Sequence, residues 1–126
     1  MEFNSLKELI DFRVKESEEN YWIEDYRRVA IAMLSQNISE TIMFIGKECN
    51  DEEFYWITEV LEDVVGKTQS KELIAICRQR LSQVDRKHYN QSCFKSDYMK
   101  KWVDYDVYVR DVSMDLDYAE GKLEQK

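Results

Sequence analysis

The stretch that decides the fold runs from Asn50 to Val84 and reads NDEEFYWITEVLEDVVGKTQSKELIAICRQRLSQV. Its apolar residues recur every three or four positions, which is the spacing of one face of an α-helix. Asn50 with Glu53 three residues later is typical of a capping box, and Gly66 is typical of a helix end. Ser70 then begins a second apolar register. We therefore predict two amphipathic helices that form a central antiparallel hairpin over residues 50–84.

The segment before this hairpin also has helical periodicity. Ser5 begins a capping-box pattern, and the apolar positions of residues 22–34 repeat every three or four residues without interruption. Asn20 and Ser39 are expected N-caps, and Asn37 suits a left-handed turn between helices. These signals predict further helices ahead of the hairpin.

The segment after the hairpin is less regular at first. Residues 85–96 lose the periodicity and are expected to form a loop or short turns. From Ser96 to Leu116 the apolar residues again step by three or four, which predicts a long helix with a second apolar stripe on its opposite side. Residues 112–117 also alternate like a strand, but no other segment predicts a partner strand. The polar tail, about residues 120–126, is expected to fray.

The composition fits one helical domain. The chain has 126 residues, of which 44% are hydrophobic and 35% charged, with no proline and three glycines. An all-β domain of this size would need many more turn residues. We predict an all-α, single-domain bundle of about five to six helices that spans residues 1–126.

The cysteines and the apolar segments indicate the compartment. Cys49, Cys77 and Cys93 are odd in number and widely spaced, which does not suit a disulfide framework. Reduced cysteines are typical of cytosolic proteins. The first residues contain neither the basic nor the apolar segment of a signal peptide. No apolar run approaches the roughly 18–20 residues that span a membrane. We expect a cytoplasmic protein without membrane contact.

The charge is distributed unevenly. The net charge is −8 overall, with −10 in residues 1–63, +6 in residues 64–103 and −4 in residues 104–126. Such a field disfavours nucleic acid as a direct ligand and favours a basic partner. We interpret the basic residues of the middle segment as a balance to the acidic helix beside them. Phosphate binding is the alternative.

The residue patterns of enzymes are missing from the sequence. His88 is the single histidine, so there is no H-E-x-x-H motif and no paired Glu-x-x-His motif; C-x-x-C and a glycine-rich phosphate loop are also absent. Cys93 near His88 lacks the orienting motif of a nucleophile pair. We therefore expect no enzymatic activity, with no catalytic residues, no cofactor and no metal ion.

Two acidic–aromatic surfaces are candidates for binding a partner. The first would line the outer face of one helix, opposite its apolar stripe; its residues are Glu52, Tyr55, Glu59 and Glu62. The second is a possible further wall; its residues are Asp104, Asp106 and Tyr108.

These surfaces have two interpretations. They are either solvated faces, whose early acids are favoured by the helix dipole, or docking surfaces with an aromatic anchor. For a docking surface, reversal of Glu59 and Glu62 to lysine is expected to weaken binding and to leave folding nearly intact.

The hairpin FYWITEVLEDVVGKTQSKELIAICRQRL and the later stretch KWVDYDVYVRDV, in a small acidic helical chain, resemble the immunity proteins of bacterial contact-dependent growth inhibition and related polymorphic toxin systems. The resemblance covers residues 20–118 in pattern. It implies a stoichiometric inhibitor that binds the C-terminal toxin domain of its cognate effector, in many systems a basic nuclease, and covers the active site. It carries over no catalytic residues. The alternative is a non-enzymatic helical regulatory adaptor that binds a cytosolic protein partner through the two-faced C-terminal helix.

Overall fold

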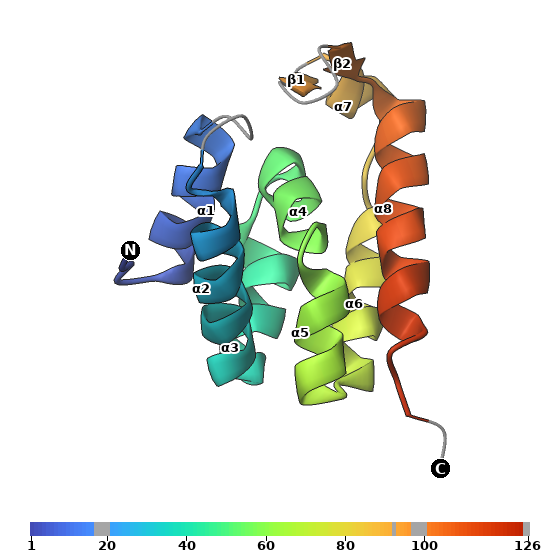
Figure 1. Ribbon diagram of the computed structural model, residues 1–126. Helices are drawn as coiled ribbons and strands as arrows, with labels where there is room; N and C mark the ends of the chain where they lie inside the picture. The colour runs from blue at the N-terminus through green and yellow to red at the C-terminus, as the bar shows by residue number, and fades with distance from the viewer. Residues whose placement is uncertain (17–20, 92, 97–100, 125–126) are drawn as a thin grey trace.

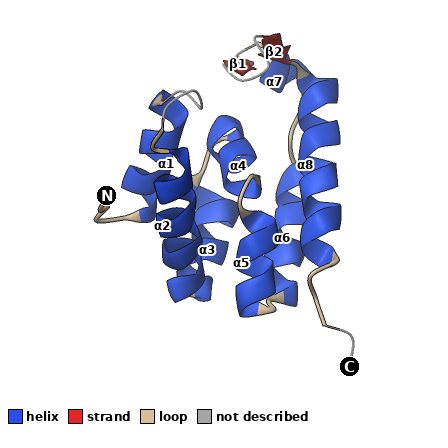
Figure 2. Cartoon of the chain, viewed as in Figure 1, coloured by secondary structure: helices blue, strands red, loops and turns tan. Residues whose placement is uncertain are grey.

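Helices dominate the computed structural model, which describes residues 1–16, 21–91, 93–96 and 101–124 (Figures 1 and 2). This part of the chain contains eight α-helices, one π-helix and two short strands. In chain order they are α1 (Leu6–Lys15), α2 (Ile23–Gln36), α3 (Ile38–Met43), the π-helix η1 (Phe44–Glu48), α4 (Asp51–Thr58), α5 (Leu61–Thr68), α6 (Lys71–Ser82), α7 (Arg86–Asn90), β1 (Phe94–Ser96), β2 (Lys101–Val103) and α8 (Tyr105–Glu120). The prediction of a mainly helical chain is confirmed, but the helices are shorter and more numerous than expected.

The helices pack around α4 and α5, which lie between α1–α3 on one side and α8 on the other (Figure 1). The long helix α8 runs alongside α4 and then α5 in the same direction. Its start is held by Tyr108, whose hydroxyl donates to the Asp51 carbonyl at 2.7 Å. Beyond its end, the Glu124 backbone N–H donates to Gln69 Oε1 at 2.7 Å. These contacts fix α8 against the rest of the bundle at both ends.

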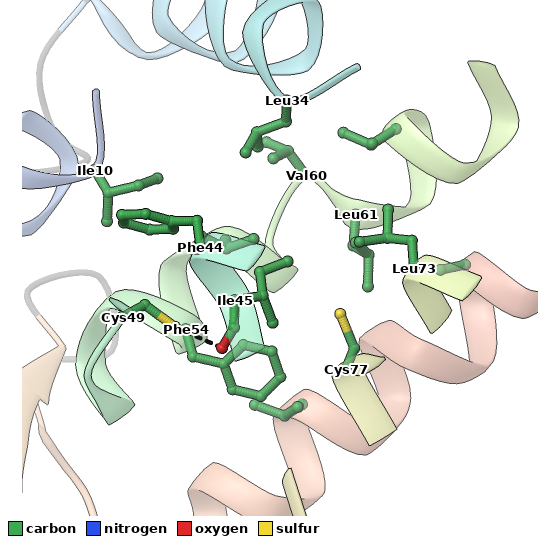
Figure 3. Packing of buried hydrophobic residues seen from close by; sticks show 14 of the residues in the cluster. Ile10, Leu34, Phe44, Ile45, Cys49, Phe54, Val60, Leu61, Leu73 and Cys77 are labelled. Atoms are coloured by element: carbon green, nitrogen blue, oxygen red, sulfur yellow. Dashed lines mark hydrogen bonds between the residues drawn. The ribbon is translucent and has the colours of Figure 1, made fainter. Parts of the chain in front are cut away.

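The apolar stripes that the sequence predicts form the core (Figure 3). Leu81 is half-buried, and the other apolar residues of the periodic pattern in residues 50–84 are buried. The buried residues are Phe54, Ile57, Leu61, Val64, Val65, Leu73, Ile74, Cys77 and Val84. Burial of one such side chain stabilises the fold by roughly 1.5–3 kcal/mol. Cys77 is fully buried as a free thiol, and the Cys49 thiol donates to the Ile45 carbonyl at 3.3 Å. The core therefore joins η1, α4, α5 and α6.

The first helix of the predicted hairpin is interrupted. The capping box is confirmed, because Asn50 and Glu53 exchange two hydrogen bonds of 2.8 Å. The helix then breaks at Glu59–Val60, where the Val60 N–H bonds to the carbonyl of Ile57. The break lets α4 pack between α1 and α8 while α5 packs against α2 and α8. The stretch therefore contains three helices instead of two.

The prediction that Gly66 ends the helix is wrong, because Gly66 lies inside α5. The helix ends at Gln69, which adopts the left-handed conformation with φ 57°. The Gln69 side-chain amide donates to the Lys122 carbonyl at 2.8 Å, so a tertiary contact compensates for the unusual backbone of a non-glycine residue. Ser70 caps α6 as expected.

The N-terminal caps are partly as predicted. Ser5 caps α1 by accepting the Glu8 N–H at 3.1 Å. Asn37 is extended, with φ −139°, and caps α3 itself, so the predictions of a left-handed Asn37 and of Ser39 as the cap are wrong. The predicted cap Asn20 lies outside the described residues.

The C-terminal helix begins later than the periodicity predicts. The residues before it form α7 and an antiparallel pair of three-residue strands, with Phe94 opposite Val103. Asp104 then caps α8, which is helical through residues 112–117, so the strand alternative for that segment is wrong. The Tyr89 hydroxyl donates to the Val103 carbonyl at 2.7 Å and ties the second strand to α7.

Within the described ranges, no single helix is long and apolar enough to cross a membrane. The pair formed by α2 and the α3–η1 segment reaches the required length and composition only as two helices bent by 99°.

Candidate protein-binding surface

One side of α8 presents acidic and apolar side chains together. Its residues follow the i, i+3, i+4, i+7 spacing that places side chains on one face of a helix. We name this surface the α8 face; its residues are Asp111, Met114, Asp115 and Tyr118. Met114 is 47% exposed and Tyr118 is 59% exposed, while the two carboxylates are partly buried. The core side of the same helix is fully buried, which makes the α8 face a rigid surface.

Asp111 is held in place by a phenol from α4. The Tyr55 hydroxyl donates to Asp111 Oδ2 at 2.7 Å, and Arg110 donates to Oδ1 at 3.2 Å. The Tyr55 ring packs against Trp56 and Phe94, at centroid distances of 5.0 and 5.2 Å. Burial and the bond to Asp111 raise the pKa of Tyr55, so it stays a donor. Tyr55 therefore orients a carboxylate of the α8 face.

The position of Asp115 disfavours the ionised form of its side chain. The pKa of Asp115 is raised from 3.8 to about 6. Burial is the largest cause, the carboxylates of Asp111, Glu59 and Glu62 act in the same direction, and a hydrogen bond with Thr58 opposes the shift. The three neighbouring carboxylates each bond a cation; the pairs are Asp111–Arg110, Glu59–Arg13 and Glu62–Lys122. Asp115 has no ion pair with any described residue. The α8 face thus contains a partly buried acid for which the described residues provide no cation.

This position predicts that Asp115→Asn stabilises the protein near neutral pH. The folded state holds the Asp115 proton more tightly than the unfolded state, so ionisation costs stability as the pH rises from about 4 to 6. The variant is expected to gain on the order of 1 kcal/mol in unfolding free energy at about pH 7 and nothing below about pH 4. Urea unfolding of both proteins at the two pH values measures this. An equal difference at both pH values would contradict the assigned pKa.

The first predicted surface is not one continuous outer face. Glu52 is half-buried and accepts the Trp56 indole N–H at 3.3 Å. Glu59 lies at the helix break, and Glu62 lies on α5, where it pairs with Lys122 at 3.4 Å. Tyr55 is turned toward α8 rather than toward solvent. The prediction of one rigid helix is therefore wrong, although Tyr55 and Glu62 do lie beside the α8 face.

The residues of the second predicted surface, Asp104, Asp106 and Tyr108, do not form one surface either. Asp104 is exposed but serves as the N-cap of α8, accepting the Val107 N–H at 2.9 Å. Asp106 is 76% exposed and bonds Arg86 at 3.0 Å, half a turn around α8 from Asp115. Tyr108 is fully buried, so its prediction as a contact residue is wrong. Met114, Asp115 and Tyr118 were missed as site residues, although their helical spacing is visible in the sequence.

Arg13 explains why Glu59 is unavailable to a partner. Its guanidinium forms two hydrogen bonds with the Glu59 carboxylate, at 2.9 and 3.0 Å, and lies 3.9 Å from the centre of the Trp56 ring. The Arg13 side chain is 2% exposed and that of Glu59 is 20% exposed. This buried pair joins α1 to the α4–α5 break. The main role of the Glu59 carboxylate is therefore to stabilise the fold rather than to bind a partner.

The other chemical candidates form no site in the described part of the chain. His88 is exposed on α7 and Cys93 is half-buried, with no hydrogen bond between their side chains. No group of three or more histidine, cysteine or acidic side chains among the described residues could hold a metal ion. The α8 face is thus the best candidate site.

Comparisons of the chain with protein-family models, with curated proteins and with solved structures found no match. The function is therefore argued from the geometry and charge of the α8 face.

Proposed function

We propose that this chain is an immunity protein that binds and neutralises the toxin domain of a cognate effector, a basic nuclease, by covering its active site. The observation that carries the proposal is the α8 face. It combines the carboxylates of Asp111 and Asp115 with the exposed side chains of Met114 and Tyr118. Tyrosine and methionine are enriched at protein interfaces, and carboxylates beside them suit a basic partner.

The missing cation at Asp115 supports a basic partner in particular. An arginine or lysine from the toxin would supply the charge that Asp115 lacks and would restore its ionised form. The aliphatic stem of that side chain would pack on Met114, and its cation would lie near the Tyr118 ring. A partly buried carboxylate contributes more to such a contact than a fully exposed one, because water screens it less.

The surrounding charge supports rapid capture of the same partner. Residues 1–63 have a net charge of −10. Glu62 and Asp63 on α5 are both more than 40% exposed, and Asp111 lies on the neighbouring α8. A field of one sign speeds diffusional encounter with a partner of the opposite sign.

Association with the toxin domain is therefore expected to depend on salt. The association rate should fall by about tenfold or more between low and physiological ionic strength, because the Debye length shortens and the long-range attraction is screened. Stopped-flow mixing of the two proteins at several salt concentrations measures this. A rate that does not change with salt would show that the contact does not rely on charge.

The direct experiment for the function asks whether the gene immediately upstream encodes a toxin domain and, if it does, uses that domain. Co-expression should protect cells from that domain, and the purified proteins should form a stoichiometric complex without nuclease activity. A toxin domain that remains active and unbound would overturn the proposal.

A helical regulatory adaptor is the second candidate. The exposure of Met114 and Tyr118 on a helix whose other side is core favours it, since a partner helix could cover that apolar surface. Complex formation with a signalling or transcription protein encoded in the same operon, and none with a toxin, would favour the adaptor.

A further inference from the structure

Residues of α3, η1 and α6 line a groove, and none of the α8 face residues lines it. Its volume is about 510 Å³, which falls within the roughly 300–1,000 Å³ that is usual for small-molecule sites. The apolar part of its lining comes from Ile42, Met43 and Ile76. Met43 is 57% exposed, which is unusual for a methionine beside a hydrophobic core. The groove therefore offers apolar surface that nothing in the described chain covers.

The π-helix and Gly46 give this groove its shape. A Cβ atom at Gly46 would lie 3.2 Å from Cδ1 of Ile76, closer than an ordinary van der Waals contact. Glycine therefore lets η1 approach α6 closely. The π-helix is a rare conformation that occurs frequently at functional sites. The backbone here departs from a regular α-helix at the position where the groove forms.

The charge of the groove is opposite to that of the chain. The chain has 26 acidic residues, yet none of the described residues that line the groove is acidic. The charged lining residues are Lys47 and Arg80. The Arg80 guanidinium already bonds Asp51 at 2.7 Å. Lys47 is exposed and forms no ion pair with a described residue. Among the described lining residues, Lys47 is therefore a cation without an ion pair, and it lies beside an apolar surface.

We propose that this groove binds a small organic anion with an apolar body, of the class of a medium-chain carboxylate. The hydrocarbon would cover Ile42, Met43 and Ile76, and the carboxylate would lie at Lys47. Gln79 also lines the groove and carries an amide donor. An inorganic anion alone would leave the apolar lining in water, and an uncharged hydrocarbon would leave Lys47 unused. This site is independent of toxin binding.

The test follows the methionine methyl groups of the full chain by nuclear magnetic resonance. Selectively labelled protein is titrated with decanoate below its micelle concentration. The Met43 methyl resonance is expected to shift and saturate, while the Met114 resonance on α8 stays unchanged. Decanol, which has the same tail without the charge, is expected to bind at least about tenfold more weakly. Acetate, which has the charge without the tail, should give no saturable shift.

A pair of matched variants tests the role of the cation. Lys47→Gln is expected to lower decanoate affinity by about tenfold, toward that of decanol. Lys67→Gln removes the same charge from an exposed position on α5 outside the groove and should leave the affinity unchanged. The proposal is overturned if Met43 gives no saturable shift, if Met43 and Met114 shift together, or if the two variants or the two ten-carbon ligands bind alike.

Discussion

The charge reversal Glu59→Lys is expected to lower the free energy of unfolding by at least about 3 kcal/mol. The Arg13 guanidinium is buried, and it donates two hydrogen bonds to the Glu59 carboxylate. A lysine would remove these two hydrogen bonds and place a second positive charge beside the buried guanidinium. Loss of one member of a buried pair costs far more than loss of an exposed pair, because the remaining charge stays desolvated. Urea unfolding followed by circular dichroism measures the change.

The matched control is Glu62→Lys, a reversal of the same kind three residues later. Glu62 is 45% exposed and its partner Lys122 is 51% exposed, so the expected cost is below about 1 kcal/mol. Equal costs for the two reversals would contradict the structural role of the Arg13–Glu59 pair. From the structure we therefore expect only Glu62→Lys to leave folding nearly intact, whereas the sequence alone led us to expect this of both reversals.

The double substitution Asp115→Lys with Tyr118→Ala is expected to weaken toxin binding by at least about a hundredfold, roughly 2.7 kcal/mol. The lysine would repel the cation that Asp115 is proposed to accept, and the alanine would remove the largest exposed side chain of the α8 face. Asp115 is partly buried and Tyr118 is exposed, whereas the core of α8 is formed by other residues, so the substitutions leave the core side chains in place. Isothermal titration calorimetry with the toxin domain measures the affinity.

The sequence predicts the local features of the fold well. The caps at Ser5, Asn50 and Ser70 depend on neighbouring residues and are found where expected. The buried stripe of residues 54–84 follows from periodicity alone. Such features need no knowledge of distant parts of the chain.

Features that depend on distant contacts are not predicted. The break at Glu59 coincides with the pair to Arg13, which lies 46 residues away in sequence. The short strands are held by Tyr89 and by packing of Phe94 on Tyr55. A helix or strand of three to eight residues is too weak by itself to be specified locally, so tertiary packing decides it.

The candidate site also depends partly on local sequence and partly on distant contacts. A helix with two apolar sides has no unique orientation in the sequence, because either side could face the core. The structure buries Tyr108, Val112 and Leu116 and leaves Met114 exposed. The orientation of α8 therefore excludes Tyr108 as a contact residue and identifies Asp115. The pKa of Asp115 is raised first by burial and then by carboxylates that include Glu59 and Glu62, which are distant in sequence, so the shift could not be foreseen from α8 alone.

The most direct test of the α8 face is one calorimetric comparison of three proteins with the same toxin domain. These are the wild type, the Asp115→Lys/Tyr118→Ala variant and Glu120→Lys, whose exposed charge lies on the other flank of α8. We expect the double variant to stay folded and to lose at least about a hundredfold in affinity, while Glu120→Lys binds within about threefold of the wild type. A folded double variant that binds as tightly as the wild type would show that the α8 face is not the toxin-binding surface.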